Sequence, residues 1–489
     1  MAHSSEGERY SFLTTLFLGP KGIFANAKIK NSLLEDIFCY VMGKKESEKA
    51  SLNADFLFTM LKKIFEVSPQ TKQMTLAFGL FDELLKNRNQ IEEELSATEK
   101  ENRKNQSINK FLVSFGTVGI KLGQILSKQT ELIKDEGLRT LLEDLSDKVP
   151  AIDKRFVLAA LKRDAIDTSK IKSIGRLLGS ASLKQVYLVT MSDNKEHVLK
   201  FNRPMSYYEI PENMTILKDV FASDEVTSKL PLSKELLKAI DESVNRELSI
   251  KSEMDQQKEI ASFIKKNTNS INSWSLTIPE INDKLVGTHL YLDQFAKGEP
   301  LKKELLSRLA EKDKKNISKL IYTSLMEQIF INGKYHADLH GGNILVDPAS
   351  KTVNLIDFGN CATIGKANKD LFIDLILSIK SSNQSKISST ITAMLASASD
   401  LQKFNQQKIQ TELTAIIIDK KGENAKISQK IRSIKNFLDK NAISFNSELE
   451  LLLKVFDTTD YISKNLTAEE IQAIFVDAIG FLTIMKKYF

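Results

Sequence analysis

The pattern of apolar and polar positions divides the chain into helical and strand-like stretches. Apolar residues recur every three or four positions over residues 31–87 and 108–148, which predicts amphipathic helices. Between 174 and 300 the pattern changes to short alternating segments, QVYLVT and HVLKF around the turn signal SDN, then SLTIPEI and THLYLDQF. These segments predict an antiparallel sheet, interrupted by a helical stretch over 231–265. After Pro300 the pattern is helical, apart from the short apolar runs NILVD and VNLID.

A small antiparallel sheet with one inserted helix, followed by a helical half, is the order of an α+β, bilobal protein-kinase-like fold. Helical extensions precede and follow this part of the chain. The first contains Gly116, Gly119 and Gly123 inside a helical pattern. Each helical Gly costs up to about 1 kcal/mol relative to Ala, so we expect another segment to approach this helix closely.

Composition narrows the class of protein. A hydrophobic fraction of 42% with 9 Pro and 20 Gly is typical of an ordered, mostly helical globular chain. The net charge of +6 is too diffuse to indicate a nucleic-acid partner. Two distant cysteines, Cys39 and Cys361, predict no disulfide framework and favour a reducing compartment.

Targeting signals are weak. The first ten residues resemble neither a signal peptide nor a transit peptide. No apolar run reaches about 18 residues, and AIFVDAIGFLTIM at 473–485, interrupted by Asp477, is predicted as a buried or interfacial helix. We therefore expect a cytoplasmic protein without a clear transmembrane helix, and peripheral membrane contact stays open.

Candidate chemistry gathers in HADLHGGN at 336–343 and in DFG at 357–359. Phosphoryl transfer needs a carboxylate at the acceptor and hard oxygen ligands for Mg²⁺. Asp338, Asn343 and Asp357 supply that set. A DFG tripeptide alone is a common turn sequence, so the hypothesis depends on the rest of the site.

Two alternatives compete with phosphoryl transfer. His336 and His340 could bind zinc, but the loop is not a helix and no third ligand pattern appears. His336 is better interpreted as a structural residue that bonds the loop backbone. A hydrolase is not favoured, because a GxSxG motif and a reactive cysteine setting are both missing.

A kinase also needs an upstream lysine on the nucleotide phosphates and a helical glutamate that holds it. Lys200 lies inside the strand HVLKF, and the following helix offers Glu247, Glu253 and Glu259. Their six-residue spacing places neighbours on different sides of a helix. We favour Glu259 as the partner of Lys200, with Glu253 turned toward another positive group.

A loop of small residues precedes the strand QVYLV. It consists of Gly179, Ser180, Ala181 and Ser182. Small residues let backbone N–H groups approach phosphates, although a single glycine leaves the loop less pliant.

Together these motifs resemble the UbiB family of atypical kinases, also called aarF-like or ADCK proteins. The motifs are KLGQ at 121–124, GSAS, LKFNRP at 199–204, EMD at 253–255, HADLHGGN and LIDFG. The helical pattern predicts a bundle and linker over 1–104. The resemblance implies a KxGQ-type extension packing on the active site over 105–172, an N-lobe over 173–297 and a C-lobe with a helical C-terminal region over 298–489.

The resemblance also implies roles for individual residues. Lys121 and Gln124 would belong to the motif that covers the nucleotide site, and Glu253 would reach Lys121. Lys200, paired with Glu259, would hold the phosphates of ATP, and Asp338 would be the catalytic-loop carboxylate. Mg²⁺ would be held by Asn343 and Asp357, and the adenine hinge would fall between Asp293 and Lys297, with Asp293, Gln294 and Phe295 at its start.

The sequence departs from the family pattern in three ways, two of which concern the site. Lys184 stands where a small residue is usual, and the usual HADPHPGN has Leu339 and Gly341 in place of its two prolines. The C-terminal membrane helices of some members are missing.

We expect an ATP- and Mg²⁺-binding ATPase, or a small-molecule or lipid kinase linked to quinone or lipid metabolism. A weakly catalytic nucleotide-binding regulator and a protein kinase are the alternatives.

Overall fold

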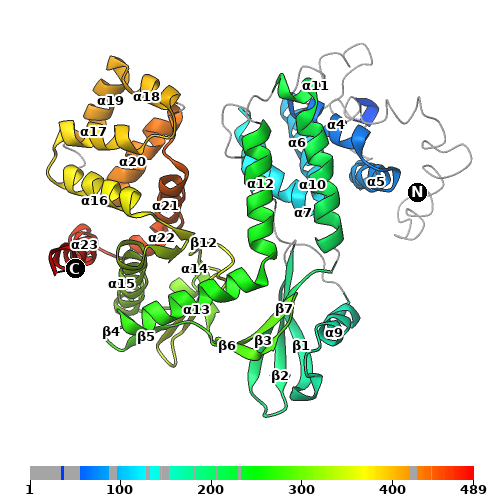
Figure 1. Cartoon of the computed structure of the whole chain (residues 1–489), viewed down its shortest axis with the longest axis horizontal. Coiled ribbons are helices and arrows are strands. Elements are labelled where there is room, and N and C mark those ends of the chain that lie inside the picture. The colour runs from blue at the N-terminus through cyan, green and yellow to red at the C-terminus, as the bar shows by residue number, and fades with distance from the viewer. Residues whose placement is uncertain are drawn as a thin grey trace, which may run out of the picture. The chain divides into compact units, whose positions relative to one another are not determined.

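The computed structural model describes residues 35–37, 56–86, 96–127, 133–143, 145, 153–180, 183–204, 206–229, 233–418, 427–441 and 443–488. These residues form two compact units. Figure 1 labels many of their helices and strands and colours the chain by residue number. The first unit draws on Met1–Ala165, Gly175–Tyr187 and Lys200–Leu248, and the second on Ile166–Ile174, Leu188–Leu199 and Ser249–Phe489.

The first unit is largely helical. Its core includes Phe111, Phe115, Leu122 and Leu217, all with no exposed surface. Helices near the N-terminus share this core, so the amphipathic helices predicted within 31–87 are confirmed over residues 56–86. The helices are α4 (Phe56–Val67), α5 (Gln70–Lys86), α6 (Ala97–Ser114), α7 (Thr117–Leu126), α8 (Glu136–Glu143), α9 (Lys154–Arg163), α10 (Ser206–Ala222), α11 (Asp224–Thr227) and α12 (Ser233–Leu248).

Part of the chain predicted as bundle and linker lies outside the described residues, including 31–34, 38–55 and 87–95. The described residues after this gap begin α6, where Ser96 and Glu99 form a capping box. The end of the predicted linker is therefore a helix.

The predicted antiparallel sheet is present in part, with strand order β1-β2-β3-β7-β6. The segment SLTIPEI, predicted to belong to it, begins instead in a strand of another sheet, where Ser275–Thr277 pair parallel with Thr352–Asn354. The SDN turn joins β2 to β3, and Asn194 takes a left-handed conformation with φ 65°. Alternate residues of β2 are buried, because successive side chains of a strand point to opposite faces. The strands are β1 (Ile171–Ser180), β2 (Lys184–Met191), β3 (Glu196–Asn202), β6 (Ile281–Val286) and β7 (Leu290–Gln294), and a 3₁₀ turn, Thr168–Lys170, precedes them.

The helical stretch predicted over 231–265 is two helices. Helix α12 ends at Leu248, and α13 (Ile250–Lys266) begins after Ser249, whose side chain accepts the Ser252 N–H. Serine is a favoured N-cap because its oxygen satisfies a backbone donor that has no intrahelical partner.

In the second unit, a further sheet has the order β4-β5-β11-β10-β8, and β9 pairs with β12. The predicted runs NILVD and VNLID are the antiparallel strands β10 and β11. The strands are β4 (Ser270–Ile271), β5 (Trp274–Thr277), β8 (Glu299–Pro300), β9 (Lys334–His336), β10 (Ile344–Asp347), β11 (Thr352–Leu355) and β12 (Cys361–Thr363).

Helices make up the rest of this unit. They are α14 (Lys303–Leu306), α15 (Glu311–Glu327) with a π turn at Gln328–Asn332, α16 (Lys366–Lys380), α17 (Gln384–Met394), α18 (Ala398–Phe404), α19 (Gln407–Ile418), α20 (Ile427–Lys440), α21 (Ser447–Thr458), α22 (Asp460–Ser463) and α23 (Ala468–Tyr488). None of the described helices combines the length and the apolar character needed to cross a membrane.

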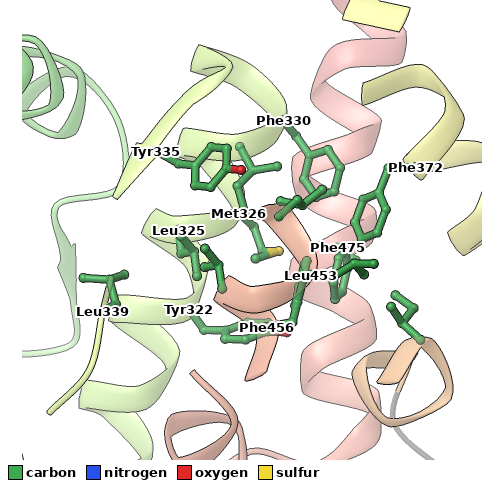
Figure 2. Packing of buried hydrophobic residues seen from close by; sticks show 14 of the residues in the cluster. Tyr322, Leu325, Met326, Phe330, Tyr335, Leu339, Phe372, Leu453, Phe456 and Phe475 are labelled. Atoms are coloured by element: carbon green, nitrogen blue, oxygen red, sulfur yellow. The ribbon is translucent and has the colours of Figure 1, made fainter. Parts of the chain in front are cut away.

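An aromatic cluster holds the second unit together (Figure 2). The Phe330 ring lies 6.2 Å from that of Phe372 and 6.0 Å from that of Phe475, and Phe372 lies 5.5 Å from Phe456. These residues come from the π turn, α16, α21 and α23, so distant segments meet here. The predicted helix at 473–485 contributes Phe475 and is buried on the face that carries it.

Candidate functional site

The loop 336–343 runs from β9 to β10, and His336 holds its start. The imidazole Nε2 lies 3.2 Å from the Ile356 carbonyl oxygen, and Nδ1 lies 3.2 Å from the Asp338 backbone nitrogen. Because a carbonyl only accepts and an N–H only donates, Nε2 carries the proton and Nδ1 accepts. The ring is fully buried, 5.0 Å from the Phe358 ring. The prediction of a structural His336 is confirmed.

The backbone of this loop brings Asp338 and Asn343 together. The Asn343 side-chain nitrogen donates to the Asp338 carbonyl oxygen at 3.0 Å, and the Asn343 backbone N–H donates to His340 at 2.9 Å. Ile356, beside Asp357, donates its N–H to the Asn343 carbonyl at 3.0 Å. The five-residue step between Asp338 and Asn343 therefore spans one closed loop.

Asp357 follows β11 in a turn that is tied to the same loop. Its φ is +60°, a left-handed conformation that Asp tolerates better than most residues, and its Oδ1 accepts the Gly359 N–H at 3.2 Å. The Ala337 N–H donates to the Asn360 carbonyl at 2.9 Å, and His336 is paired with Cys361 across β9 and β12. The HADLHGGN and DFG segments thus form one hydrogen-bonded structure.

Asn343 and Asp357 offer oxygen atoms of the type that Mg²⁺ prefers. The Asn343 amide nitrogen faces the Asp338 carbonyl, so its oxygen is the atom turned toward a possible ligand. An amide oxygen with a carboxylate is a set of hard donors, and Mg²⁺ usually completes its shell with water and phosphate oxygens. No cluster of three or more His, Cys, Asp or Glu able to hold a metal occurs among the described residues. A zinc site at His336 finds no support, since both ring nitrogens contact backbone.

Cys361, two residues after the DFG segment, is a poor nucleophile. Cys361 is buried and its thiol donates to the Phe358 carbonyl at 3.5 Å. Burial raises the pKa of the Cys361 thiol to about 12, so little nucleophilic thiolate exists at neutral pH. The thiol gives no support to a hydrolase.

The two residues that depart from the family's HADPHPGN have packing reasons. Leu339 is fully buried (Figure 2). Its carbonyl oxygen lies 3.5 Å from the Tyr461 hydroxyl. At Gly341, a Cβ atom would lie 2.3 Å from the Leu301 carbonyl oxygen. A proline has the same Cβ, so the close approach of Leu301 accounts for glycine at this position.

Replacing Gly341 by Ala is expected to destabilise the second unit by about 1–3 kcal/mol, the usual cost of overpacking. The Leu301 backbone cannot move away cheaply, because its N–H donates to the Ile344 carbonyl at 2.9 Å. The urea midpoint measures the effect. Gly179→Ala is the matched control, since a Cβ there meets no atom within 4 Å. Equal midpoints for the two variants would contradict the packing argument.

Stability is expected to fall with pH below 6.5 because of His336. Burial lowers the pKa of the His336 imidazole below its ordinary value of 6.5. The unfolded chain then binds more protons between these two pKa values, so stability rises with pH across that window and is lost as the pH falls through it. The loss is up to about 1.4 kcal/mol for each unit by which the pKa is lowered.

Urea midpoints at pH 7.5 and pH 5 test this dependence in the wild type and two variants. His336→Asn should lose the part of the pH dependence that comes from the buried ring. His340→Asn, at an exposed position of the same loop, should retain it. Retention of the whole dependence in His336→Asn would show that another group is responsible.

The three carboxylates predicted on one helix have different surroundings. Glu253 is 1% exposed and accepts the Tyr291 hydroxyl hydrogen at 2.8 Å. Glu259, predicted as the partner of Lys200, instead has a side chain that is 47% exposed and pairs with Lys334 at 2.5 Å. Its role at Lys200 stays a prediction, and Glu253 is the buried carboxylate of α13.

The third carboxylate, Glu247, belongs to α12 and pairs with Lys121 of α7. The resemblance implied Glu253 as that partner. The helix break at Ser249 explains the difference, because Glu247 and Glu253 lie on separate helices. Gln124, on the same helix as Lys121, donates its side-chain N–H to the Leu145 carbonyl at 3.1 Å.

The close approach predicted at the glycine-bearing helix is confirmed. A Cβ at Gly119 would lie 2.1 Å from the Leu112 carbonyl oxygen, and one at Gly123 would lie 2.2 Å from the Leu145 side chain. Gly116, with φ +81°, starts α7. The glycines therefore let α7 pack tightly within its own unit.

The small-residue loop begins at the end of β1. Ala181 and Ser182 lie outside the described residues. Ser180 accepts hydrogen bonds from the side chains of Gln185 at 3.2 Å and Arg203 at 2.7 Å. Sequence reasoning missed both donors, although Arg203 stands in the quoted LKFNRP motif only three residues after Lys200. Lys200 itself is 9% exposed.

The predicted hinge begins with the last two residues of β7, Asp293 and Gln294. Asp293 is buried, and its Oδ1 accepts the Gln257 side-chain N–H at 2.8 Å. Gln294 donates its backbone N–H to Glu280, and Phe295 donates its own to Glu196, so the sheet holds both residues. Binding of adenine in this segment stays a prediction.

Comparison with known proteins places these features in a family. Residues 147–391, half of the chain, match the family model described as the ABC1 atypical kinase-like domain. An uncharacterised protein from the hydrogenase 1 5′ region of Clostridium pasteurianum is 25% identical over 71% of this chain and 65% of that protein. A probable protein kinase UbiB of Shewanella oneidensis is 26% identical over 60% of this chain and 54% of its own.

The chain thus spans 54% to 65% of the length of these curated relatives. Among solved structures, that of Rv3197 from Mycobacterium tuberculosis, a complex with erythromycin, has 18% identity and a TM-score of 0.48, covering 78% of this chain and 97% of the other. The antiparallel sheet, the helical remainder and the family match confirm the α+β, kinase-like fold class. The chain belongs to the family of ABC1 atypical kinase-like proteins.

Proposed function

We propose that this protein binds ATP with Mg²⁺ and acts as an ATPase or as a kinase of a small molecule or lipid. The observation that carries the proposal is the hydrogen-bonded structure of the HADLHGGN and DFG segments. It holds the Asp338 carboxylate, the Asn343 amide and the Asp357 carboxylate on two loops joined through Ile356 and Ala337.

Four residues of the chain have defined roles in this proposal. Lys200 offers a cation to the nucleotide phosphates, and Asp338 orients the acceptor hydroxyl or water and accepts its proton. Asn343 and Asp357 would hold a magnesium ion, which when bound neutralises the charge of the phosphates. Fixed groups of this kind accelerate transfer mainly through positioning and electrostatics.

The acceptor class is proposed to be a lipid or a quinone-related phenol, with peripheral contact to a membrane. This proposal is based on the motifs shared with the UbiB family, KLGQ among them. The test measures Mg²⁺-dependent phosphate release from ATP alone, with phospholipid vesicles, and with simple phenols resembling quinone precursors. We expect release to rise several-fold with one of these additions. No rise with any of them would contradict the acceptor class but not ATP binding.

A second candidate is a nucleotide-dependent regulator that binds ATP without useful turnover. Lys184, the first residue of β2, favours it, because an added cation beside the small-residue loop changes how a nucleotide is held. Single-turnover phosphate release distinguishes the two functions. An enzyme should release more phosphate than its Asp338→Asn variant, whereas a regulator without useful turnover should not.

A further inference from the structure

Two buried cations lie close together in sequence at the end of β3. Lys200 is 9% exposed, and Arg203, one residue beyond the strand, is 8% exposed. Removing a cation from water is costly unless polar or anionic groups compensate. A buried arginine at such a position therefore calls for a structural or a ligand-binding reason.

Arg203 connects the end of β1 to the segment after β3. One guanidinium nitrogen donates to the Ser180 hydroxyl oxygen at 2.7 Å, and the Arg203 backbone N–H donates to the Leu183 carbonyl at 2.8 Å. The arginine thus contacts residues on both sides of the turn between β1 and β2.

A second side chain supports the same hydroxyl from β2. Gln185, fully buried, donates its side-chain N–H to the Ser180 oxygen at 3.2 Å, and its own oxygen accepts from the Tyr187 hydroxyl at 3.4 Å. The Ser180 oxygen accepts two hydrogen bonds from different elements, so its place at the start of the small-residue loop is fixed by Arg203 and Gln185.

We propose that Arg203 is a positioning residue that fixes the start of the small-residue loop through Ser180 and thereby sets the affinity for a nucleotide polyphosphate. The inference rests on the proposed function, because it assumes that this loop meets phosphates. A Ser180 side chain already held by Arg203 loses less conformational freedom when a ligand binds, which increases affinity. The positive charge of the Arg203 guanidinium also attracts a polyanion.

The environment of the guanidinium is consistent with this role. Burial lowers the pKa of the Arg203 guanidinium, which means that its surroundings disfavour the charged form. An arriving polyphosphate would offset that penalty. Adenosine, which has no phosphate, would gain nothing from the same residue.

The test compares the affinities of purified full-length variants for MgATP and for adenosine. Arg203→Gln is expected to weaken MgATP binding about 10- to 100-fold, the usual effect of losing a hydrogen bond from a charged group. Adenosine binding should change less than about twofold. Ser180→Ala should weaken MgATP about three- to tenfold, and the double variant should resemble Arg203→Gln alone, because both changes break one connection.

Matched controls lie on the same strand as Ser180. Arg176→Gln and Ser173→Ala remove the same groups at exposed positions of β1 and should leave MgATP affinity unchanged. Arg203→Lys retains the charge without the guanidinium geometry and should fall between the wild type and Arg203→Gln. If Arg203→Gln is unfolded at the assay temperature, Ser180→Ala decides the same question.

Three outcomes overturn the inference. They are unchanged MgATP affinity in both Arg203→Gln and Ser180→Ala, an equal loss for adenosine and MgATP, and additive losses in the double variant. Wild-type protein that binds no MgATP under any condition would instead overturn the proposed function. The measurement on the wild type therefore distinguishes failure of the inference from failure of the proposed function.

Discussion

Replacing Asp338 by Asn is expected to lower single-turnover ATP hydrolysis about 10²- to 10⁴-fold, the range that a positioned general base contributes. Asn retains the size of the side chain but accepts a proton poorly. The fold should persist, because the hydrogen bond from Asn343 reaches the Asp338 backbone carbonyl rather than its carboxylate. A rapid-mix assay with excess enzyme and labelled ATP measures the phosphate released in one turnover.

Asp283→Asn is the matched control for this change. Its side chain is 67% exposed on β6 and pairs with Lys258 at the surface. The control should hydrolyse ATP like the wild type. Phosphate release by the wild type that equals that of Asp338→Asn would reject the enzymatic proposal and leave the nucleotide-dependent regulator as the better account.

Asp357→Asn is expected to remove most of the stabilisation that Mg²⁺ and ATP give the protein. A ligand that binds only the folded state at about 100 times its Kd raises the free energy of unfolding by about 2.7 kcal/mol. Loss of the Asp357 carboxylate weakens the metal site and so reduces this gain. Melting curves with ATP, recorded with Mg²⁺ and with EDTA, measure the difference.

Asparagine is the informative substitution at this position. Asp357 has φ +60°, and asparagine tolerates this conformation, whereas alanine would add backbone strain unrelated to the metal. The melting temperature without nucleotide should therefore stay close to that of the wild type. A full Mg²⁺-dependent shift in the variant would place the metal on other residues.

The order of elements was predictable from the sequence, because helix and strand periodicity depend on neighbours a few residues apart. The hairpin around Asn194, the strands β10 and β11 and the helical C-terminal part follow that pattern. The five-residue step from Asp338 to Asn343 was also visible, since both residues lie in one short loop. Local spacing was enough to predict the structural role of His336.

Side-chain partners were decided by the tertiary structure. The break at Ser249 puts Glu247 and Glu253 on separate helices, and Lys121 pairs with Glu247. The hydrogen bond from Arg203 to Ser180 joins residues that are 23 positions apart.

The sequence alone therefore determined the fold class of this atypical kinase-like protein and the short HADLHGGN and DFG motifs, since both depend on local periodicity and spacing. Only the tertiary structure decided why Gly341 replaces a proline, which acid of α13 is buried and which side chains hold Ser180. The physical reason is that close approaches, burial and ion pairs arise where segments distant in sequence pack together.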